Sequence, residues 1–282
     1  MGRALVLLTM LLAMRSALAA CPDAAAVAAY LDDFTALRVS TGFGRDISYG
    51  DAVCARAKLN AALPAVMGPV VGYKAVFTNP ESQKRFGVAG ADWGVMYGRM
   101  MLPSGARVPA AFGALPRYEA DFIVVVKDAG LADAANRAEA LAHIEALVPF
   151  IELPDLMIAG TPTGAELVAT NAAFRGGVLG TPIPVREAQS LARALADMDV
   201  VITENASGQE LGREKGRVLM GHPLNAAIWL ARALQRSGIE LKPGDLLSLG
   251  GFEGSAPARS GTSISVRYLG LPGDPAVTVH FY

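Results

Sequence analysis

Cysteine is scarce in this 282-residue chain, which contains only Cys21 and Cys54. Two cysteines do not make a disulfide framework, so the small cysteine-stapled folds of secreted proteins are excluded. Alanine-rich composition, early acids and a proline near the first turn predict helices at residues 23–38 and 51–64. If these helices pack antiparallel, the two cysteines lie at opposite ends of the pair, beyond the reach of a disulfide. We therefore expect no bridge between them.

The chain also lacks an excess of positive charge and, beyond its first twenty residues, any long apolar run. Its 25 Lys and Arg residues are balanced by 26 Asp and Glu residues, a formal net charge of −1. Without a basic stripe, binding to nucleic acid is not expected. No stretch reaches the roughly 20 apolar residues that a transmembrane helix needs.

The first twenty residues have the pattern of an export signal. Arg3 supplies a positive start, residues 4–14 form an apolar segment, and residues 17–19 (Ala-Leu-Ala) are a small-residue cleavage pattern. Residues 18–21 (Leu-Ala-Ala-Cys) also fit the cleavage box of a bacterial lipoprotein, in which Cys21 would carry the lipid. The sequence therefore predicts export, and it leaves open a periplasmic protein and one that is lipid-anchored at Cys21.

Two acidic residues begin a strand that is otherwise apolar. Residues 116–126 read Pro-Arg-Tyr-Glu-Ala-Asp-Phe-Ile-Val-Val-Val, and the unbroken apolar run is typical of a strand covered on both faces. Because alternate residues share a face, the carboxylates of Glu119 and Asp121 project side by side. They repel each other unless a cation, a proton or a basic group lies between them. The pair is a candidate metal or catalytic site, although two solvated acids at an exposed strand end would look the same.

Two more charged residues occur in apolar, strand-like surroundings. Glu152 interrupts the apolar run of residues 148–155, and Lys74 lies in the middle of residues 70–78. Buried carboxylates are rare unless they are paired or bind metal. A buried lysine lowers its pKa or pairs with an anion, whereas most lysines extend to solvent. Three acids in such settings indicate one common site.

The remaining segments suggest mixed helices and strands. We expect Asp92 to lie in a glycine-rich loop at residues 87–94, and residues 131–147 to form an amphipathic helix. Residues 174–184 are typical of a turn-rich bend. Further helices are expected at residues 79–86, 185–196 and 223–238, and strands at residues 198–203 and within 241–282.

Six short motifs follow one another along the chain. They are residues 72–74 (Gly-Tyr-Lys), 87–94 with Asp-Trp-Gly at its end, 116–121, 149–152 (Pro-Phe-Ile-Glu), 221–230 and 244–250. Their content and order resemble the 2-keto-4-pentenoate hydratases of the fumarylacetoacetate hydrolase superfamily, which also contains 4-oxalocrotonate decarboxylases. The resemblance implies an α+β fold, a mixed β-sandwich roll with N-terminal helices. It divides the chain into a signal peptide (1–20), a helical portion (21–70) and a catalytic domain (71–282).

The resemblance also implies a set of site residues. The family's Glu-x-Glu pair and third acid correspond to Glu119, Asp121 and Glu152, which would bind Mg²⁺ or Mn²⁺ through hard oxygen ligands. In the family the ion chelates the carboxylate and 2-oxo oxygen of a 2-keto acid and stabilises the resulting enolate. Lys74 and Asp92 match the family's proton-handling positions.

The chain departs from the family pattern at three places. Asp121 stands where glutamate is usual. Residues 170–173 read Thr-Asn-Ala-Ala in place of Asp-Asn-Ala-Ser, and Leu249 replaces the threonine that commonly precedes Gly250. Asn171 and Gly250 are the expected substrate-binding residues, and two hydroxyl groups expected near the substrate are missing.

The implied activity is that of a hydratase, a lyase of aromatic catabolism that adds water to a 2-hydroxy-2,4-dienoate through a metal-bound enolate. A related 2-keto acid decarboxylase or C–C hydrolase is the alternative within the superfamily, since it uses the same chemistry. An exported protein that binds a 2-keto acid without turnover is the alternative from another class. The missing hydroxyls favour this alternative, whereas Lys74 and Asp92 oppose it. Family members are commonly homo-oligomers, and export is unusual among enzymes of intracellular aromatic catabolism.

Overall fold

The structure is a computed structural model that describes residues 21–186 and 188–282, so the expected signal peptide lies outside it. Its α-helices are α1 (Ala24–Thr35), α2 (Tyr49–Ala62), α3 (Pro64–Met67), α4 (Pro80–Phe86), α5 (Arg137–Ala142), α6 (Gly164–Ala169), α7 (Ala188–Asp197) and α8 (Pro223–Arg236). Its strands are β1 (Val70–Val76), β2 (Asp92–Tyr97), β3 (Met101–Pro103), β4 (Ala106–Val108), β5 (Arg117–Val126), β6 (Ile144–Pro154), β7 (Phe174–Leu179), β8 (Ile183–Pro184), β9 (Asp199–Glu204), β10 (Gln209–Lys215), β11 (Leu246–Ser248), β12 (Ala256–Pro257), β13 (Ser263–Leu269) and β14 (Ala276–Phe281).

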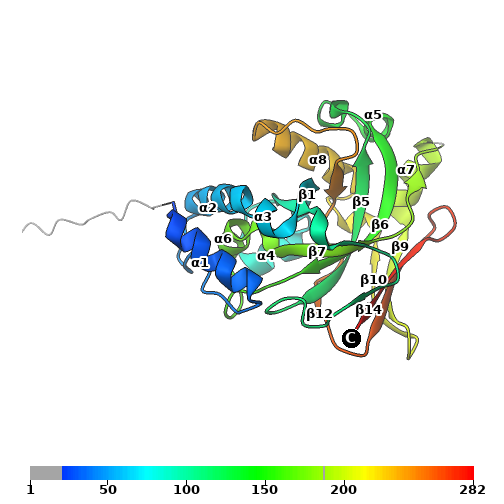
Figure 1. The fold of residues 1–282 in the computed structure, drawn as a ribbon. Coiled ribbons are helices and arrows are strands. Elements are labelled where there is room, and N and C mark those ends of the chain that lie inside the picture. Colours follow the sequence, from blue (N-terminus) through cyan, green and yellow to red (C-terminus); the bar gives the residue numbers. More distant parts are fainter. Residues whose placement is uncertain (1–20, 187) are drawn as a thin grey trace, which may run out of the picture.

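Two mixed sheets pack against each other in a sandwich-like roll (Figure 1). The first sheet has the order β2-β1-β11-β5-β6-β7-β3, with β12 added to β5 and β8 to β6, and the second has the order β10-β9-β13-β14-β4. Between them the rings of Phe122 and Tyr268 are 5.1 Å apart. The Tyr268 hydroxyl also donates a hydrogen bond to the carbonyl of Asp121, which ties the second sheet to the strand of the candidate site. The expected α+β roll is confirmed.

Helices cover the first sheet from two directions. Helix α8 contacts β1, β2 and β11, and its buried face includes Leu224, Ala231 and Leu234. The N-terminal helices α1 and α2 lie beside α3, α4 and α6 (Figure 1), and α2 contacts α6. Tyr30 and Phe34 of α1 belong to the same apolar cluster as Phe150 of β6. This packing buries β5 and β6 along most of their length, as the apolar run at residues 116–126 predicted.

Three secondary-structure expectations were wrong. Asp92 begins strand β2, where it lies opposite Val76 of β1, instead of lying in a loop. Only α5 of the helix expected at residues 131–147 forms, because residues from Ile144 onward pair with β5, and tertiary pairing overrides helix propensity there. The bend expected at residues 174–184 contains strand β7. Gly177 allows close packing there, since a Cβ at this position would lie 2.1 Å from the Phe150 ring.

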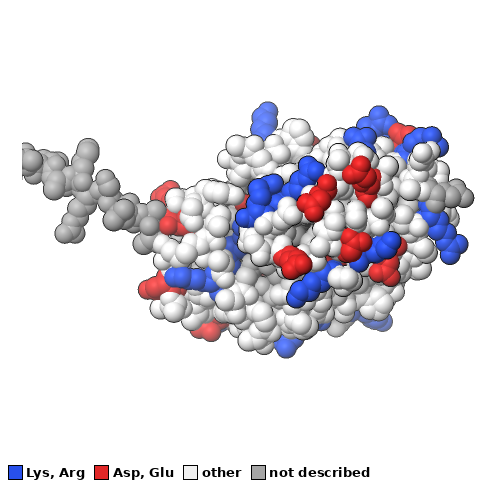
Figure 2. Space-filling model, turned by 90° about the horizontal axis from the view of Figure 1, so that it is seen from above, with Lys and Arg blue, Asp and Glu red and all other residues white. Residues whose placement is uncertain are grey.

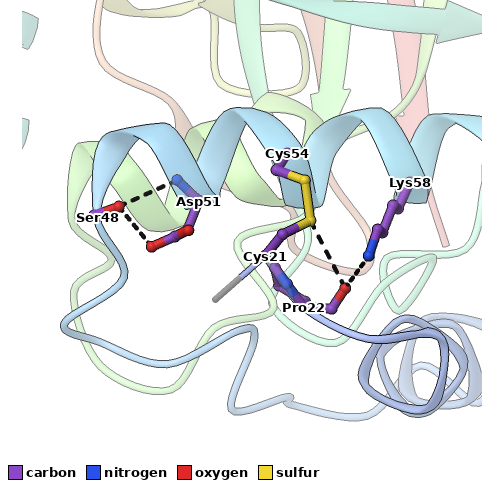
Figure 3. Close-up of a disulfide and its surroundings, with 6 residues drawn as sticks. All are labelled: Cys21, Pro22, Ser48, Asp51, Cys54 and Lys58. Atoms are coloured by element: carbon purple, nitrogen blue, oxygen red, sulfur yellow. Dashed lines mark hydrogen bonds between the residues drawn. A yellow bond between two sulfur atoms is a disulfide. The ribbon is translucent and has the colours of Figure 1, made fainter. Parts of the chain in front are cut away.

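The expectation for the cysteines was also wrong, because Cys21 and Cys54 form a disulfide with a Cα–Cα distance of 5.6 Å. Helix α1 begins only at Ala24, after its N-cap Asp23, so Cys21 precedes the helix. The segment that carries Cys21 and Pro22 lies alongside the middle of α2 (Figure 3), where Lys58 Nζ donates a hydrogen bond of 2.7 Å to the Pro22 carbonyl. The expectation failed because it placed Cys21 inside an ideal helix, and this overestimated the distance between the two cysteines.

No helix within the described ranges is long and apolar enough to cross a membrane. On the face drawn in Figure 2, Lys and Arg side chains lie interspersed with Asp and Glu side chains. This surface agrees with the balanced composition of the chain.

Candidate active site

Three carboxylates meet where β5 and β6 lie side by side. Glu119 of β5 stands directly opposite Glu152 of β6, and Asp121 follows two residues later on β5. One carboxylate oxygen from each residue lies within 4.8 Å of the others. Asp121 and Glu152 are fully buried, while Glu119 is partly exposed. The structure thus brings together all three acids that the sequence singled out.

Lys74 supplies the positive charge next to this cluster. Its Nζ forms a buried ion pair with Glu152 Oε1 and donates a hydrogen bond of 3.1 Å to the carbonyl of Ala172. Burial alone would lower the pKa of Lys74, but the attraction of Glu152 and Glu119 outweighs it and raises the pKa above its usual value. Of the two possibilities for a buried lysine, pairing with an anion is the one observed.

The cluster carries more negative charge than Lys74 can balance. Burial and the neighbouring Glu152 raise the pKa of Glu119 well above its usual value. The same two causes raise the pKa of Asp121 to about 7. Each shift reflects a carboxylate held in a site that disfavours its ionised form.

A divalent cation fits this excess of charge. Glu152 Oε2 is buried and has no hydrogen-bond partner within the described residues. Such an orphaned buried oxygen is rare, and a cation in contact with it would satisfy it. Carboxylate oxygens are the ligands that Mg²⁺, Mn²⁺ and Ca²⁺ prefer. The three acids therefore suit a divalent metal ion, with Lys74 neutralising part of their charge.

Backbone and side-chain donors fix the orientation of Asp121. Its Oδ2 accepts a hydrogen bond of 2.5 Å from the Ser248 hydroxyl, and its Oδ1 accepts one of 3.1 Å from the Gly250 amide. Gly250 adopts φ +102°, and a Cβ there would lie 2.4 Å from Oγ1 of Thr78, so glycine is required. Gly250, expected to bind substrate, thus contacts a proposed metal ligand through its amide.

Asp92 is held by a different set of partners from those of the three acids. Its Oδ1 pairs with Arg56 Nη1 at 2.5 Å, and its Oδ2 accepts a hydrogen bond of 2.6 Å from the Tyr49 hydroxyl. Burial and the bond to Asp92 raise the pKa of Tyr49 to about 12, so this hydroxyl keeps its proton. The guanidinium of Arg56 also lies 4.1 Å from the Trp93 ring. A proton-handling role for Asp92 stays a prediction.

Asn171 supports the turn that faces Lys74. Its side chain accepts a hydrogen bond of 2.7 Å from the Val95 amide and donates one of 2.8 Å to the Val95 carbonyl. Asn171, Ala172 and Ala173 all have positive φ, between 52° and 56°. Such a conformation is costly for alanine, and strained backbone of this kind clusters at functional sites. Asn171 therefore stabilises the turn whose Ala172 carbonyl binds Lys74, and its substrate-binding role stays a prediction.

A cavity of about 410 Å³ leads to the acidic cluster. Its polar lining includes Lys74 and Glu119, and its apolar wall includes Phe77, Phe86 and Leu167. Charged and polar side chains also line it, among them Glu81, Arg85, Glu214 and Glu253. A small organic acid in this cavity would reach Lys74 and Glu119, with Asp121 and Glu152 behind them.

Sequence reasoning missed three residues that orient the site. Ser248 carried a usable signal, because a hydroxyl within the apolar run of residues 246–249 must find a buried partner. Arg56 and Tyr49 carried no such signal. Their bonds to Asp92 join positions 36 and 43 residues apart, and these contacts exist only once α2 packs beside β2.

No protein-family model matches the chain. A 2-keto-4-pentenoate hydratase of Burkholderia vietnamiensis (strain G4) is 32% identical to it over 206 residues, which cover 71% of this chain and 76% of that protein. The enzyme of the same name from Paraburkholderia phymatum is 29% identical over 227 residues, which cover 79% of this chain and 84% of that protein.

Two solved structures share the fold. A 4-oxalocrotonate decarboxylase from Pseudomonas putida G7, complexed with magnesium and adipate, has a TM-score of 0.78 at 22% identity and covers 92% of this chain and 96% of its own. A fumarylpyruvate hydrolase from Pseudomonas aeruginosa, in complex with Mn²⁺ and pyruvate, has a TM-score of 0.54 at 14% identity, with coverages of 74% and 89%. At these identities the two structures confirm the fold of the fumarylacetoacetate hydrolase superfamily. Membership of the hydratase family rests on the sequence relatives.

Proposed function

This chain belongs to the 2-keto-4-pentenoate hydratase family, and we propose that it is a metal-dependent hydro-lyase that adds water to a 2-hydroxy-2,4-dienoate, the enol form of a small 2-keto-4-enoate. One observation carries the proposal. Three facing carboxylates, one of them with an orphaned buried oxygen, lie with a buried lysine at a cavity of suitable size. Hydration of such an acid needs both a centre of positive charge and a group that moves protons.

Glu119, Asp121 and Glu152 would hold the cation, with Mg²⁺ or Mn²⁺ as the expected ion. When bound, the ion supplies the positive charge that attracts the carboxylate and 2-oxo oxygen of the substrate and stabilises negative charge developing on that oxygen. The chain itself orients the ligands. Lys74 fixes Glu152, and the donors from Ser248 and Gly250 fix Asp121.

Lys74 is the residue best placed to exchange a proton with the substrate, because its ammonium lies both in the cavity lining and against the acidic cluster. The apolar wall at Phe77, Phe86 and Leu167 would contact the hydrocarbon end of the dienoate. Arg56 and Tyr49 bind the two carboxylate oxygens of Asp92, so a proton would reach Asp92 only through these partners.

Arg85 favours a second candidate, a decarboxylase acting on a 2-keto acid with two carboxylates. Arg85 lines the cavity, and its guanidinium forms no ion pair within the described residues. It could bind a carboxylate at the far end of a longer substrate. Glu81, Glu214 and Glu253 line the cavity in addition to Glu119 and oppose a second negative charge, so hydration of a monocarboxylate remains the leading proposal.

The alternative of a binding protein without turnover rests on the missing hydroxyls. Ala173 lines the cavity, so a substrate there would lack a hydrogen bond that a serine hydroxyl at this position would offer. Leu249 is buried in the main apolar cluster and does not line the cavity, so its difference from the family pattern has no direct effect there. A homo-oligomeric assembly stays a prediction.

The test is to incubate the purified chain with Mg²⁺ or Mn²⁺ and 2-hydroxypenta-2,4-dienoate and to follow the loss of dienol absorbance. We expect metal-dependent loss that EDTA abolishes. Glu119→Gln should lower kcat/KM at least a hundredfold, since it removes a charged ligand from an ion whose contribution is several kcal/mol.

The matched control is Glu145→Gln, which makes the same change at an exposed position of β6. It should leave turnover unchanged. Tight binding of oxalate or a 2-keto acid with no turnover of any dienol would instead favour the binding protein. Metal binding that survives Glu119→Gln would contradict the ligand assignment.

A further inference from the structure

The Cys21–Cys54 disulfide bears on a choice that the sequence left open. Cys21 is the residue that a lipoprotein signal would expose as the new N-terminus, and its Sγ is the atom that would carry the lipid. In the structure this atom is bonded to Cys54 Sγ, and no free cysteine exists within the described residues. Lipidation and disulfide formation would therefore both use the sulfur atom of Cys21.

The two modifications exclude each other chemically. Lipidation joins Cys21 Sγ to a diacylglyceryl carbon as a thioether, and a sulfur with two bonds cannot also join a second sulfur. A chain that is lipid-anchored at Cys21 would leave Cys54 as a thiol, and a chain with the disulfide has no sulfur left for the lipid.

The surroundings of Cys21 favour the disulfide. Cys21 and Pro22 are partly buried against α2, and the Pro22 carbonyl binds Lys58 (Figure 3). Asp23 caps α1 by accepting a hydrogen bond of 2.8 Å from the Ala26 amide. Cys21 is thus fixed between the start of α1 and the middle of α2, whereas a lipid anchor requires an N-terminus that extends from the protein to a membrane.

We propose that Cys21 is oxidised to a disulfide with Cys54 and is not lipidated, so that the exported chain is a free protein of an oxidising compartment. In this step both thiols lose their protons, one Sγ–Sγ bond forms, and two electrons pass to the disulfide of a thiol–disulfide oxidoreductase, which becomes a dithiol. Disulfides persist in oxidising compartments and are rare in the reducing cytosol. The bond therefore agrees with the export signal expected at residues 1–20 and removes one of its two outcomes.

The inference extends to how the site is built. Helix α2, which receives the disulfide at Cys54, also carries Tyr49 and Arg56, the two partners of Asp92. The segment around Cys21 is thereby cross-linked to the helix that orients Asp92. A relative without this bond would have to hold the same helix by packing alone.

The test expresses the full chain, residues 1–282, in a bacterial host and fractionates the cells without reductant. We expect the protein in the soluble periplasmic fraction, with an intact mass that matches cleavage after residue 19 or residue 20 and is about 2 Da lower than that of the corresponding dithiol form. A peptide linking Cys21 to Cys54 should disappear on reduction, and a fatty-acid probe should label nothing.

Cys21→Ser separates the alternatives further. If the disulfide is the native state, this variant and the wild type both fractionate as soluble protein. Wild-type protein in the membrane fraction with a labelled Cys21, released only by Cys21→Ser, would overturn the proposal. Two thiols that react with an alkylating agent in freshly isolated native protein would overturn it as well.

Discussion

Two buried ion pairs have their acids three residues apart, Glu152 in β6 and Asp155 just after its end. The pairs differ in how completely their charges and polar atoms find partners. Lys74 pairs with Glu152, whose second carboxylate oxygen has no partner within the described residues. Arg175 pairs with Asp155 at 3.0 Å, and Asp155 also accepts hydrogen bonds from the amides of Ala114 and Leu115. No side chain of either pair is more than 6% exposed, so burial does not distinguish them.

The Arg175 pair is complete. Its guanidinium donates a second hydrogen bond of 2.8 Å to the carbonyl of Phe34 and stacks 3.8 Å from the Phe34 ring. It joins α1 to the end of β6 and leaves no charge unbalanced. The Lys74 pair belongs to a cluster with two further carboxylates and remains short of positive charge. Burial of a charge is common to both places, and only the unsatisfied one has capacity left for a ligand.

The largest expected effect comes from breaking the complete pair. Arg175→Met leaves the carboxylate of Asp155 buried without its cation, and we expect it to lower the free energy of unfolding by about 3–5 kcal/mol. Urea unfolding monitored by circular dichroism measures this loss. Arg38→Met is the control, because it removes an exposed ion pair with Asp33, and it should cost at most about 0.5 kcal/mol. Equal effects of the two changes would contradict the distinction between buried and exposed pairs.

The disulfide stabilises the same part of the molecule as the Arg175–Asp155 pair, because it fixes the start of α1, the helix that carries Phe34. The cross-link joins residues 33 positions apart. In the chain-entropy model its removal by Cys21→Ser costs about 3–4 kcal/mol of unfolding free energy. Adding a reductant to the wild type should reproduce this loss, whereas the variant should not respond to reductant. A variant as stable as the oxidised wild type would show that packing alone holds α1.

Removing a charge from the acidic cluster should raise the free energy of unfolding of the metal-free protein. Glu119→Gln removes one of three repelling carboxylates, so in EDTA at pH 8 we expect the metal-free protein to gain about 1 kcal/mol of stability. With Mg²⁺ the order should reverse, because the wild type gains stability from binding the ion and the variant does not. Thermal unfolding with and without Mg²⁺ measures both signs. A metal-free Glu119→Gln protein less stable than the wild type would contradict the excess of negative charge.

Sequence patterns located the acids of the site but not its geometry. Glu119 and Asp121 share a face by strand periodicity, and Glu152 stands out as a charge in an apolar run, so residue type and spacing alone mark all three as candidates. The register that sets Glu119 opposite Glu152 does not follow from either segment by itself, because it depends on pairing between residues 33 positions apart. The roles of Lys74 and Asp92 rest on the family resemblance and stay predictions.

Local patterns failed where tertiary contacts decide the conformation. The segment at residues 144–147 has helical periodicity together with the preceding residues, yet it becomes part of β6 because β5 offers a buried edge. Gly176 and Gly177 indicated a turn, although their role is to let Met100 and Phe150 approach the strand. The disulfide was missed for a similar reason, since two helix lengths do not specify where the segment before α1 lies.

A third buried ionisable group, His222, is satisfied only when it is neutral. His222 caps α8, its Nδ1 accepts a hydrogen bond from the Leu224 amide, and its Nε2 lies 2.9 Å from the Ala192 carbonyl. Burial lowers the pKa of His222, with a further contribution from Arg137, while the Ala192 carbonyl and Asp197 oppose this shift. A protonated Nδ1 could not accept the bond from Leu224, so the cap requires the neutral ring.

The sign of the pH dependence follows from this shift. The folded protein binds the proton of His222 less readily than the unfolded chain, so the stabilisation is complete above a pH of about 6.5 and declines as the pH falls toward the folded-state pKa. The loss is at most about 1.4 kcal/mol per pH unit in that window. His222→Asn keeps a capping oxygen but does not titrate, so the difference in unfolding free energy between wild type and variant should shrink from pH 7.5 to pH 5. Parallel stability curves would show that folding leaves the pKa of His222 unchanged, and would contradict a cap that requires the neutral ring.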